Sequence, residues 1–222
     1  MGIEDYFKKN NIVPKRIEEI SEEYRRIYFI YDKSRFISEF CKSNMDDFVD
    51  CVDYENSSFL FDVVAREASR YSDLFEPCCM SGLLGCYLAS ELEGVKYKGI
   101  DINEVAIDKA KKRAIANNLS PDIFEVKDKL EYKQKHVAVV GKYVANAYNS
   151  KRIVVDEQAI KWLSGISDNI ILIGFTRPNL FENDREEFSG SFKRYGYKLD
   201  ILTALRKGEC RQGDFFVMKA AR

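Results

Sequence analysis

After residue 70, short runs of apolar and β-branched residues alternate with segments of helical periodicity. The strand-like runs cover residues 73–76, 96–100, 122–126, 137–140 and 170–173. The helical patterns cover residues 82–93, 103–118, 156–166 and 184–195. Parallel strands need a connection of roughly a dozen residues, which a helix supplies, so the alternation predicts βαβ units and a parallel sheet.

The end of the chain follows a different pattern. Residues 197–205 and 214–220 are strand-like, and the polar sequence RKGECRQG joins them without a helix. Two strands joined by a short polar loop form an antiparallel hairpin. The predicted fold class is therefore α/β: a doubly wound, mostly parallel seven-stranded sheet with a terminal antiparallel hairpin.

Residues 1–70 contain no strand-like run. Apolar side chains recur there at helical spacing among dense charges, as at Ile17, Ile20 and Tyr24, and Pro14 suits a helix start. We expect a helical N-terminal cap over residues 1–70 and the α/β domain over residues 71–222.

Charge and hydropathy exclude several classes of protein. The 222 residues carry 35 basic and 36 acidic side chains, a net charge of −1, so no global attraction to nucleic acid is expected. No segment approaches the roughly 18 consecutive apolar residues that a membrane span needs. The N-terminus lacks the apolar stretch and cleavage site of a signal peptide. We therefore expect a cytoplasmic protein without a membrane partner.

Cysteine and histidine usage argues against a metal site. The six cysteines are scattered, with Cys78–Cys79 as the only adjacent pair, and His136 is the only histidine. No spacing typical of a zinc site occurs, so no bound metal is expected and the thiols are expected to be free.

The most specific signal lies between residues 73 and 118. A buried strand ends in Glu76, a glycine-containing turn follows, and a helix begins near Gly82. The next strand ends in Asp101. Ligands of doubly wound sheets bind at the carboxyl ends of strands, and an acid at the end of the second strand can accept two hydrogen bonds from a ribose diol. This edge is the candidate ligand site.

These motifs resemble those of class I S-adenosylmethionine (SAM) methyltransferases. The sequence EPCCMSG resembles the first motif of the family, especially its D-P-x-x-G-S-G variant, and GIDIN resembles the second. The resemblance covers roughly residues 70 to 220. It implies a Rossmann-like methyltransferase domain with S-adenosyl-L-methionine as cofactor, and S-adenosylhomocysteine as the product that it releases.

The resemblance also implies roles for individual residues. Glu76 and the backbone around Cys78 and Gly82 would hold the methionine portion of the cofactor. Asp101 would hold the ribose, and Ile102 would lie against the adenine face.

A further pair follows the third strand. Asp128, in the sequence EVKDKL, stands where the family places the acid that pairs with the adenine amino group. Asp128 and Lys129 would therefore lie at the edge of the adenine ring.

The turn after the first strand departs from the family pattern. Met80 occupies the central glycine position and Cys78 the earlier one. If the backbone at Met80 must adopt positive φ, a residue other than glycine costs about 1 kcal/mol or more. The substitution is either tolerated or it weakens the cofactor site.

The fourth strand lacks the N-P-P-Y-like motif of many amino-methylating members. Its sequence VVGK resembles a tRNA ribose-methylating family in which this strand ends V-G-K-H-x-C-G, and Gly141 and Lys142 match that pattern. Gly141 is then a candidate cofactor contact. Lys142 could accept a proton from a 2′-hydroxyl if its pKa were depressed, or it is a solvent-facing lysine. Asn146 is expected at the substrate mouth, and Lys142 and Asn146 are the candidate catalytic residues.

One basic run is interpreted as structural. Lys109, Lys111, Lys112 and Arg113 are expected to form the solvated face of the second helix of the α/β domain rather than an RNA-binding patch.

Three functions are consistent with these motifs. The leading hypothesis is a SAM-dependent methyltransferase acting on RNA, such as tRNA, or on a small molecule. The second is a degenerate methyltransferase-fold module that binds RNA or a protein partner, for which Met80 is the best argument. The third is an NAD-dependent oxidoreductase, because MSGLLG is part of a G-x-G-x-x-G pattern. The sequence leaves the oligomeric state open.

Overall fold

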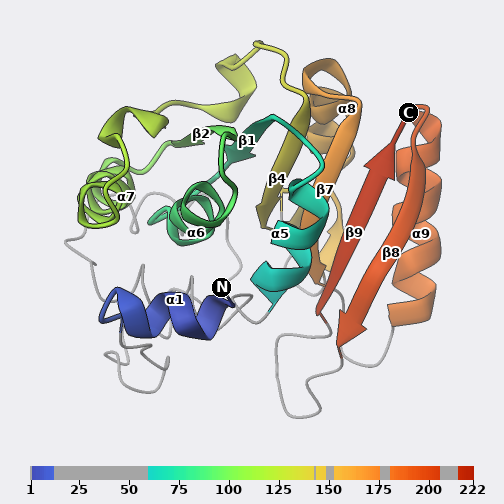
Figure 1. Ribbon diagram of the computed structural model, residues 1–222. Coiled ribbons are helices and arrows are strands. Elements are labelled where there is room, and N and C mark those ends of the chain that lie inside the picture. Colours follow the sequence, from blue (N-terminus) through green and yellow to red (C-terminus); the bar gives the residue numbers. More distant parts are fainter. Residues whose placement is uncertain (1, 13–59, 143, 149–152, 176–180, 206–214) are drawn as a thin grey trace, which may run out of the picture.

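A seven-stranded sheet forms the centre of the protein (Figure 1). The computed structural model describes residues 2–12, 60–142, 144–148, 153–175, 181–205 and 215–222. In the order in which they lie side by side, the strands are β3 (Phe124–Val126), β2 (Lys96–Asp101), β1 (Asp73–Pro77), β4 (Ala138–Lys142), β7 (Asn169–Phe175), β9 (Phe215–Ala221) and β8 (Lys198–Leu205).

The strand order confirms the predicted fold class. Strands β1, β2, β3, β4 and β7 pair in parallel, and β9 pairs antiparallel with both β7 and β8. The chain runs outward from β1 to β3 and then crosses back to β4. The order therefore reverses between β1 and β4, which is where doubly wound sheets bind their ligands.

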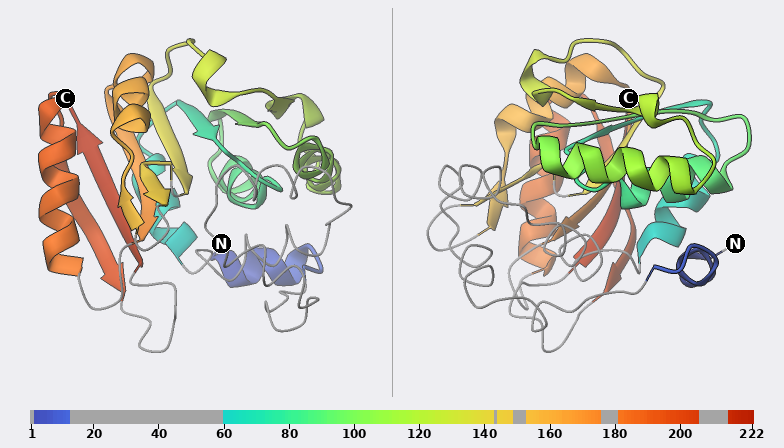
Figure 2. Two further views of the ribbon diagram at one scale, coloured as in Figure 1. Left: turned by 180° about the vertical axis from the view of Figure 1, so that it is seen from behind. Right: turned by 90° about the vertical axis from the view of Figure 1, so that its left-hand side faces the viewer.

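Helices cover both faces of the sheet (Figure 2). One face carries α5 (Phe61–Ala68), α6 (Leu83–Glu91) and α7 (Glu104–Ala116), and the other carries α8 (Glu157–Ile166) and α9 (Phe181–Arg194). Alternate residues of β7 enter the two cores: Ile171 packs on the first face and Leu172 on the second. The run Ile170–Ile173 is wholly apolar because helices cover both faces of this strand.

The N-terminal helix α1 (Ile3–Lys9) belongs to the first of these two cores. Tyr6 is fully buried there, with its ring centre 5.4 Å from that of Tyr87 on α6. Asp62 of α5 links the three helices, because its Oδ1 accepts hydrogen bonds from the Ile3 N–H at 2.9 Å and from the Tyr87 hydroxyl at 2.5 Å. Burial and the Asp62 bond raise the pKa of Tyr87. Residues 13–59 lie outside the described part of the chain, so the helical cap expected over residues 1–70 stays a prediction.

The structure adds elements that the sequence patterns did not indicate. A small antiparallel pair, β5 (Asn146–Tyr148) and β6 (Ile153–Val155), stands between β4 and α8. A 3-10 helix, η3 (Pro121–Ile123), replaces the predicted start of β3, because Ser120 Oγ accepts the Asp122 N–H at 3.2 Å and Pro121 lacks a donor for a sheet. A second one, η4 (Lys129–Glu131), follows β3.

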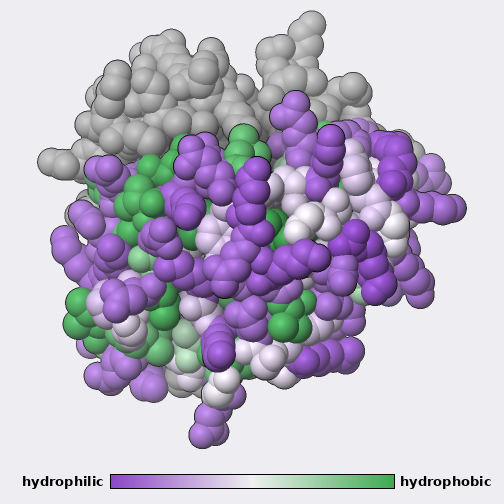
Figure 3. Space-filling view, turned by 90° about the horizontal axis from the view of Figure 1, so that it is seen from above, coloured by the Kyte–Doolittle hydropathy of each residue, from purple (hydrophilic) through white to green (hydrophobic). Residues whose placement is uncertain are grey.

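The surface seen from above is mostly hydrophilic, with small separate hydrophobic groups (Figure 3). Large exposed apolar side chains in the described part of the chain include Ile102, Val126 and Leu130, which lie on or near the loop after β3. None of the described helices is long and apolar enough to cross a membrane.

The Asp62 junction makes a testable contribution to stability. Asp62→Ala should lower the free energy of unfolding by about 2 kcal/mol, because the Tyr87 hydroxyl and the Ile3 N–H lose their acceptor. Asp5→Ala removes an exposed acid from α1 and should change stability by less than about 0.5 kcal/mol. Urea unfolding of both variants measures the difference. Equal effects would show that Asp62 does not anchor α1.

Candidate functional site

The predicted site residues converge on one edge of the sheet, formed by the carboxyl ends of the central parallel strands. Glu76 lies near the end of β1, Asp101 ends β2, Asp128 follows β3, and Gly141 and Lys142 end β4. This edge contains the point where the strand order reverses.

Residues 78–82, which we call the β1–α6 turn, have an unusual backbone. The φ angles of Cys78, Met80 and Gly82 are 57°, 52° and 69°, all in the left-handed region. The D-P-x-x-G-S-G variant has glycine at the positions of Met80 and Gly82, and the family's glycine-rich turn also has one at the position of Cys78, but only Gly82 is glycine here. The positive φ considered for Met80 is observed, and Cys78 shares it. Each of these two residues costs about 1 kcal/mol in backbone strain.

The third position accepts only glycine. A Cβ at Gly82 would lie 2.6 Å from Phe124 Cζ and 2.8 Å from the Ala110 methyl group. The turn therefore packs directly on β3 and α7 at this point. The side chains of Cys78 and Met80 are half-buried.

The end of β2 holds the turn through hydrogen bonds. Asp101 Oδ2 accepts the Met80 N–H at 3.0 Å, and the Cys79 N–H donates to the Ile100 carbonyl at 3.0 Å. The Gly82 N–H closes the turn on the Cys79 carbonyl at 2.9 Å. These bonds fix peptide planes on both sides of the strained residues.

Asp101 and Asn103 form a buried polar pair beside the turn. Asp101 is 7% exposed, and its Oδ1 accepts the Asn103 N–H at 3.0 Å. The Asn103 side chain caps α7 by accepting the Ala106 N–H at 3.2 Å. Within the described part of the chain, Asn103 Nδ2 is buried and has no hydrogen-bond partner. A donor in this position is available to a bound ligand.

The side chain of Arg113, on α7, hydrogen-bonds to the turn. Its Nη1 donates to the Ser81 carbonyl at 2.6 Å and to Ser81 Oγ at 2.7 Å, and Ser81 is fully buried. The prediction that Arg113 belongs to the solvated face of this helix is wrong. Arg113 lies seven residues after Ala106 and three after Ala110, both buried, so helical periodicity places it on the inner face.

Glu76 is fully buried and faces Tyr97 of β2, whose hydroxyl donates to Glu76 Oε2. Burial, followed by the charge of Glu76, holds the pKa of Tyr97 well above its usual range. The tyrosine thus keeps its proton and serves as a donor. Sequence reasoning missed Tyr97; the small residue Gly85 on the covering helix, where a Cβ would overlap the Tyr97 ring, was the available signal.

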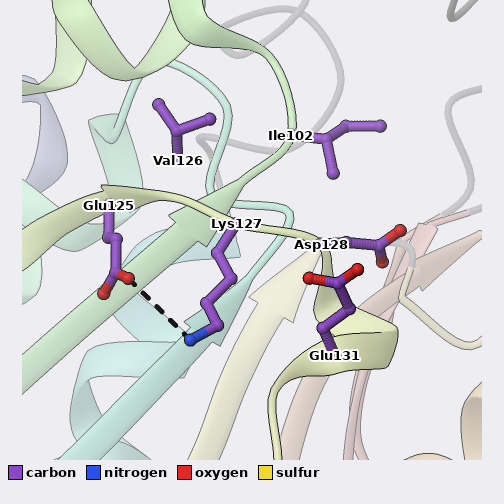
Figure 4. Close-up of a pocket in the computed structure, with 6 residues that line it drawn as sticks. All are labelled: Ile102, Glu125, Val126, Lys127, Asp128 and Glu131. Carbon is purple, nitrogen blue, oxygen red and sulfur yellow. Dashed lines mark ion pairs between the residues drawn. The ribbon is translucent and has the colours of Figure 1, made fainter.

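An open pocket of about 490 Å³ lies at the ends of β2 and β3 (Figure 4). Ile102 and Val126 line it with their apolar side chains 43% and 42% exposed. Asp128 also lines it, and its Oδ1 accepts the Leu130 N–H at 2.8 Å, which caps η4. The remaining lining residues are Glu125, Lys127 and Glu131.

The charges of the pocket are unevenly placed. Glu125 pairs with Lys98 at 2.9 Å and with Lys127 at 3.9 Å, and the Lys98 hydrogen bond lowers the pKa of Glu125. Asp128 and Glu131 lie on the other side of the pocket in Figure 4. The acidic side of the pocket therefore adjoins Ile102.

Four predicted site residues remain: Lys129, Gly141, Lys142 and Asn146. Lys129 is half-buried in η4 and is not among the residues that line the pocket. Lys142 is 5% exposed, with Nζ 5.5 Å from the centre of the Phe61 ring, so it is buried and not solvent-facing. Gly141 is buried in β4. Asn146 begins β5, and its side chain lies outside the described structure.

Metal-ligand geometry is not found in this part of the chain. In the residues that the structure describes, no group of three or more His, Cys, Asp or Glu side chains could hold a metal ion.

Similar solved structures establish the fold. Magnesium protoporphyrin IX methyltransferase from Synechocystis PCC 6803, with bound SAM, is 19% identical over 91% of this chain and 92% of that chain, with a TM-score of 0.53. The N-terminal domain of EvdMO1, in the presence of SAH and D-fucose, is 12% identical over 87% and 99%, with a TM-score of 0.57. The ribosomal protein L11 methylase from Lactobacillus delbrueckii subsp. bulgaricus is 14% identical over 74% and 77%, with a TM-score of 0.53.

The first and third of these neighbours are named as methyltransferases, and this chain has the class I methyltransferase fold. No protein-family model and no curated protein sequence matches it.

Two glycine substitutions separate close packing from backbone strain. Gly82→Ala and Gly94→Ala both place a side chain at positive φ, which costs about 1 kcal/mol. Only at Gly82 does the new Cβ overlap Phe124 and Ala110, whereas Gly94 faces open space. Gly82→Ala should therefore lower the free energy of unfolding by about 2 kcal/mol more than Gly94→Ala, as measured by urea unfolding. Similar losses would mean that the turn does not pack on β3 and α7.

Proposed function

We propose that the protein is a SAM-dependent methyltransferase that binds its cofactor across the ends of β1, β2 and β3. The observation that carries the proposal is the β1–α6 turn. Cys78, Met80 and Gly82 all adopt left-handed φ, which suits a glycine-rich turn, and Asp101 joins this turn to Ile102, the next residue, which lines the open pocket. A turn held in this strained form at two residues other than glycine is typical of a functional site.

The proposed contacts use groups that lie at this edge of the sheet. The backbone at Cys78 and Gly82, with Glu76 beneath it, would hold the methionine portion. Asp101 would accept hydrogen bonds from the ribose, because a carboxylate oxygen can accept more than one hydrogen bond.

The buried Asn103 Nδ2 beside Asp101 supplies a further donor for this part of the cofactor. Ile102 would lie against the adenine face, with Asp128 and Lys129 at its edge. Gly141, buried at the end of β4, would border the site from the other side.

The charge of the pocket supports SAM over a dinucleotide. The adenosine of NAD carries a pyrophosphate, whereas the adenosine of SAM carries no phosphate. Three of the four charged residues around the pocket are acidic: Glu125, Asp128 and Glu131. These acids disfavour a pyrophosphate nearby, although salt screens exposed charges.

Methyl transfer from a sulfonium is an in-line displacement, so much of the catalysis comes from alignment of the acceptor with the methyl group. The chain provides this alignment by fixing the cofactor against the turn. Lys142 and Asn146 are the proposed catalytic residues, because they follow the switch point at the end of β4. Lys142, buried with its Nζ over the Phe61 ring, would orient the acceptor.

The methyl acceptor is proposed only as a class: an RNA, such as tRNA, or a small molecule. The neighbouring structures have names that specify a porphyrin and a ribosomal protein as substrates, so one fold serves chemically unrelated acceptors. The loops that would select the acceptor lie beyond β4 and β7. We further propose a cytoplasmic location.

Thermal unfolding with SAM, S-adenosylhomocysteine or NAD tests the cofactor. A ligand at about 100 times its Kd adds roughly 2.7 kcal/mol, which for a chain of this size raises the midpoint by about 5–10 °C. SAM and S-adenosylhomocysteine should produce this shift and NAD none. Asp128→Ala should reduce the shift, whereas Asp108→Ala, an exposed acid on α7, should not.

A shift with NAD alone would instead support the oxidoreductase. No shift with any of the three ligands would favour a degenerate module that binds RNA or a protein partner.

A further inference from the structure

The side chain of Arg113 hydrogen-bonds the β1–α6 turn to α7. One guanidinium nitrogen, Nη1, bonds both to the carbonyl and to the hydroxyl of Ser81. The carbonyl bond fixes the peptide plane between Ser81 and Gly82. A charged donor on a buried acceptor makes this one of the stronger hydrogen bonds of the turn.

The hydrogen bonds from Arg113 to Ser81 matter because of where Ser81 lies in the turn. Ser81 lies between Met80 and Gly82, two residues in the left-handed region. On the other side of Met80, its own N–H is held by Asp101. The strained residue is therefore fixed from β2 on one side and from α7 on the other.

A turn with glycine at these positions does not need these additional hydrogen bonds, because glycine adopts positive φ without steric cost. At Cys78 and Met80 positive φ is strained, and relaxation of these residues to negative φ would relieve the strain and change the shape of the turn. An external clamp that holds the strained form replaces what the missing glycines would provide.

We propose that Arg113 is a positioning residue for the cofactor, which holds the β1–α6 turn in the geometry that two absent glycines would otherwise supply. This inference rests on the proposed methyltransferase function. Arg113 does not touch the reacting atoms; it acts through Ser81 and the backbone of the turn.

A purely structural role would leave a different signature. If Arg113 only joined α7 to the first core, its loss would lower stability but leave the affinity of the folded protein for S-adenosylhomocysteine unchanged. A positioning role predicts a loss of affinity in protein that is still folded.

The first experiment is titration calorimetry with S-adenosylhomocysteine at a temperature where every variant is folded. Arg113→Met should weaken binding by about tenfold, and Arg113→Lys, which keeps one charged donor, should weaken it less. Lys112→Met removes the same charge from an exposed position of the same helix and should stay within about twofold. Unchanged affinity in Arg113→Met would overturn the inference.

The second experiment tests the link to the missing glycines. In a Cys78→Gly, Met80→Gly background the turn is unstrained, so adding Arg113→Met should cost less than about threefold in affinity. The same tenfold loss in both backgrounds would overturn the claim that Arg113 compensates for the two substitutions.

The third experiment needs no ligand and therefore separates this inference from the proposed function. In Arg113→Met, amide hydrogen exchange of Cys79, Met80 and Gly82 should be about tenfold faster, with the amides of β7 unchanged. Unchanged exchange in the turn would overturn the inference. If the unaltered protein binds no S-adenosylhomocysteine, the proposed function fails, and the exchange result still decides whether Arg113 holds the turn.

Discussion

The site depends on the hydrogen bonds that the Asp101 carboxylate accepts. Its two oxygens accept the N–H groups of Met80 and Asn103, so one side chain at the end of β2 fixes both the β1–α6 turn and the start of α7. The parallel pairing of β1 with β2 brings these elements together, with Glu76 opposite Gly99. The pocket then forms where β2 and β3 end, because Ile102 and Asp128 follow directly. The sheet thus positions Asp101, and the hydrogen bonds of Asp101 fix the turn and the start of α7 at the carboxyl ends of the strands.

The turn shows how a strained backbone can persist without its usual glycines. Left-handed φ at Cys78 and Met80 costs about 2 kcal/mol together. The hydrogen bonds that the turn makes with Ile100, Asp101 and Arg113 each contribute roughly 1 kcal/mol or more, and the two that involve a charged side chain contribute most. Their sum exceeds the strain, which explains why the glycine conformation survives the substitutions. Only Gly82 is fixed by sterics, because Phe124 and Ala110 leave no room for a side chain.

The fold was predictable because each of its signals is local. Alternating apolar runs and helical periods define βαβ units, and RKGECRQG marks the terminal hairpin. The convergence of Glu76, Asp101 and Asp128 was also predictable, since parallel strands end at the same edge. Long-range contacts were not predictable. The hydrogen bond from the Tyr97 hydroxyl to Glu76 depends on the space that Gly85 leaves, and the Arg113 bond to Ser81 joins residues 32 positions apart in the sequence. Burial of Lys142 likewise requires Phe61 of α5, about 80 residues earlier in the chain.

The central claim is that this turn and the adjacent pocket bind the cofactor. A crystal structure of the protein with S-adenosylhomocysteine tests it most directly. The account predicts the adenine ring against Ile102 and beside Asp128, with Cys78 and Met80 still at positive φ. Ligand bound away from this edge, or a turn that has relaxed to negative φ at both residues, would contradict it.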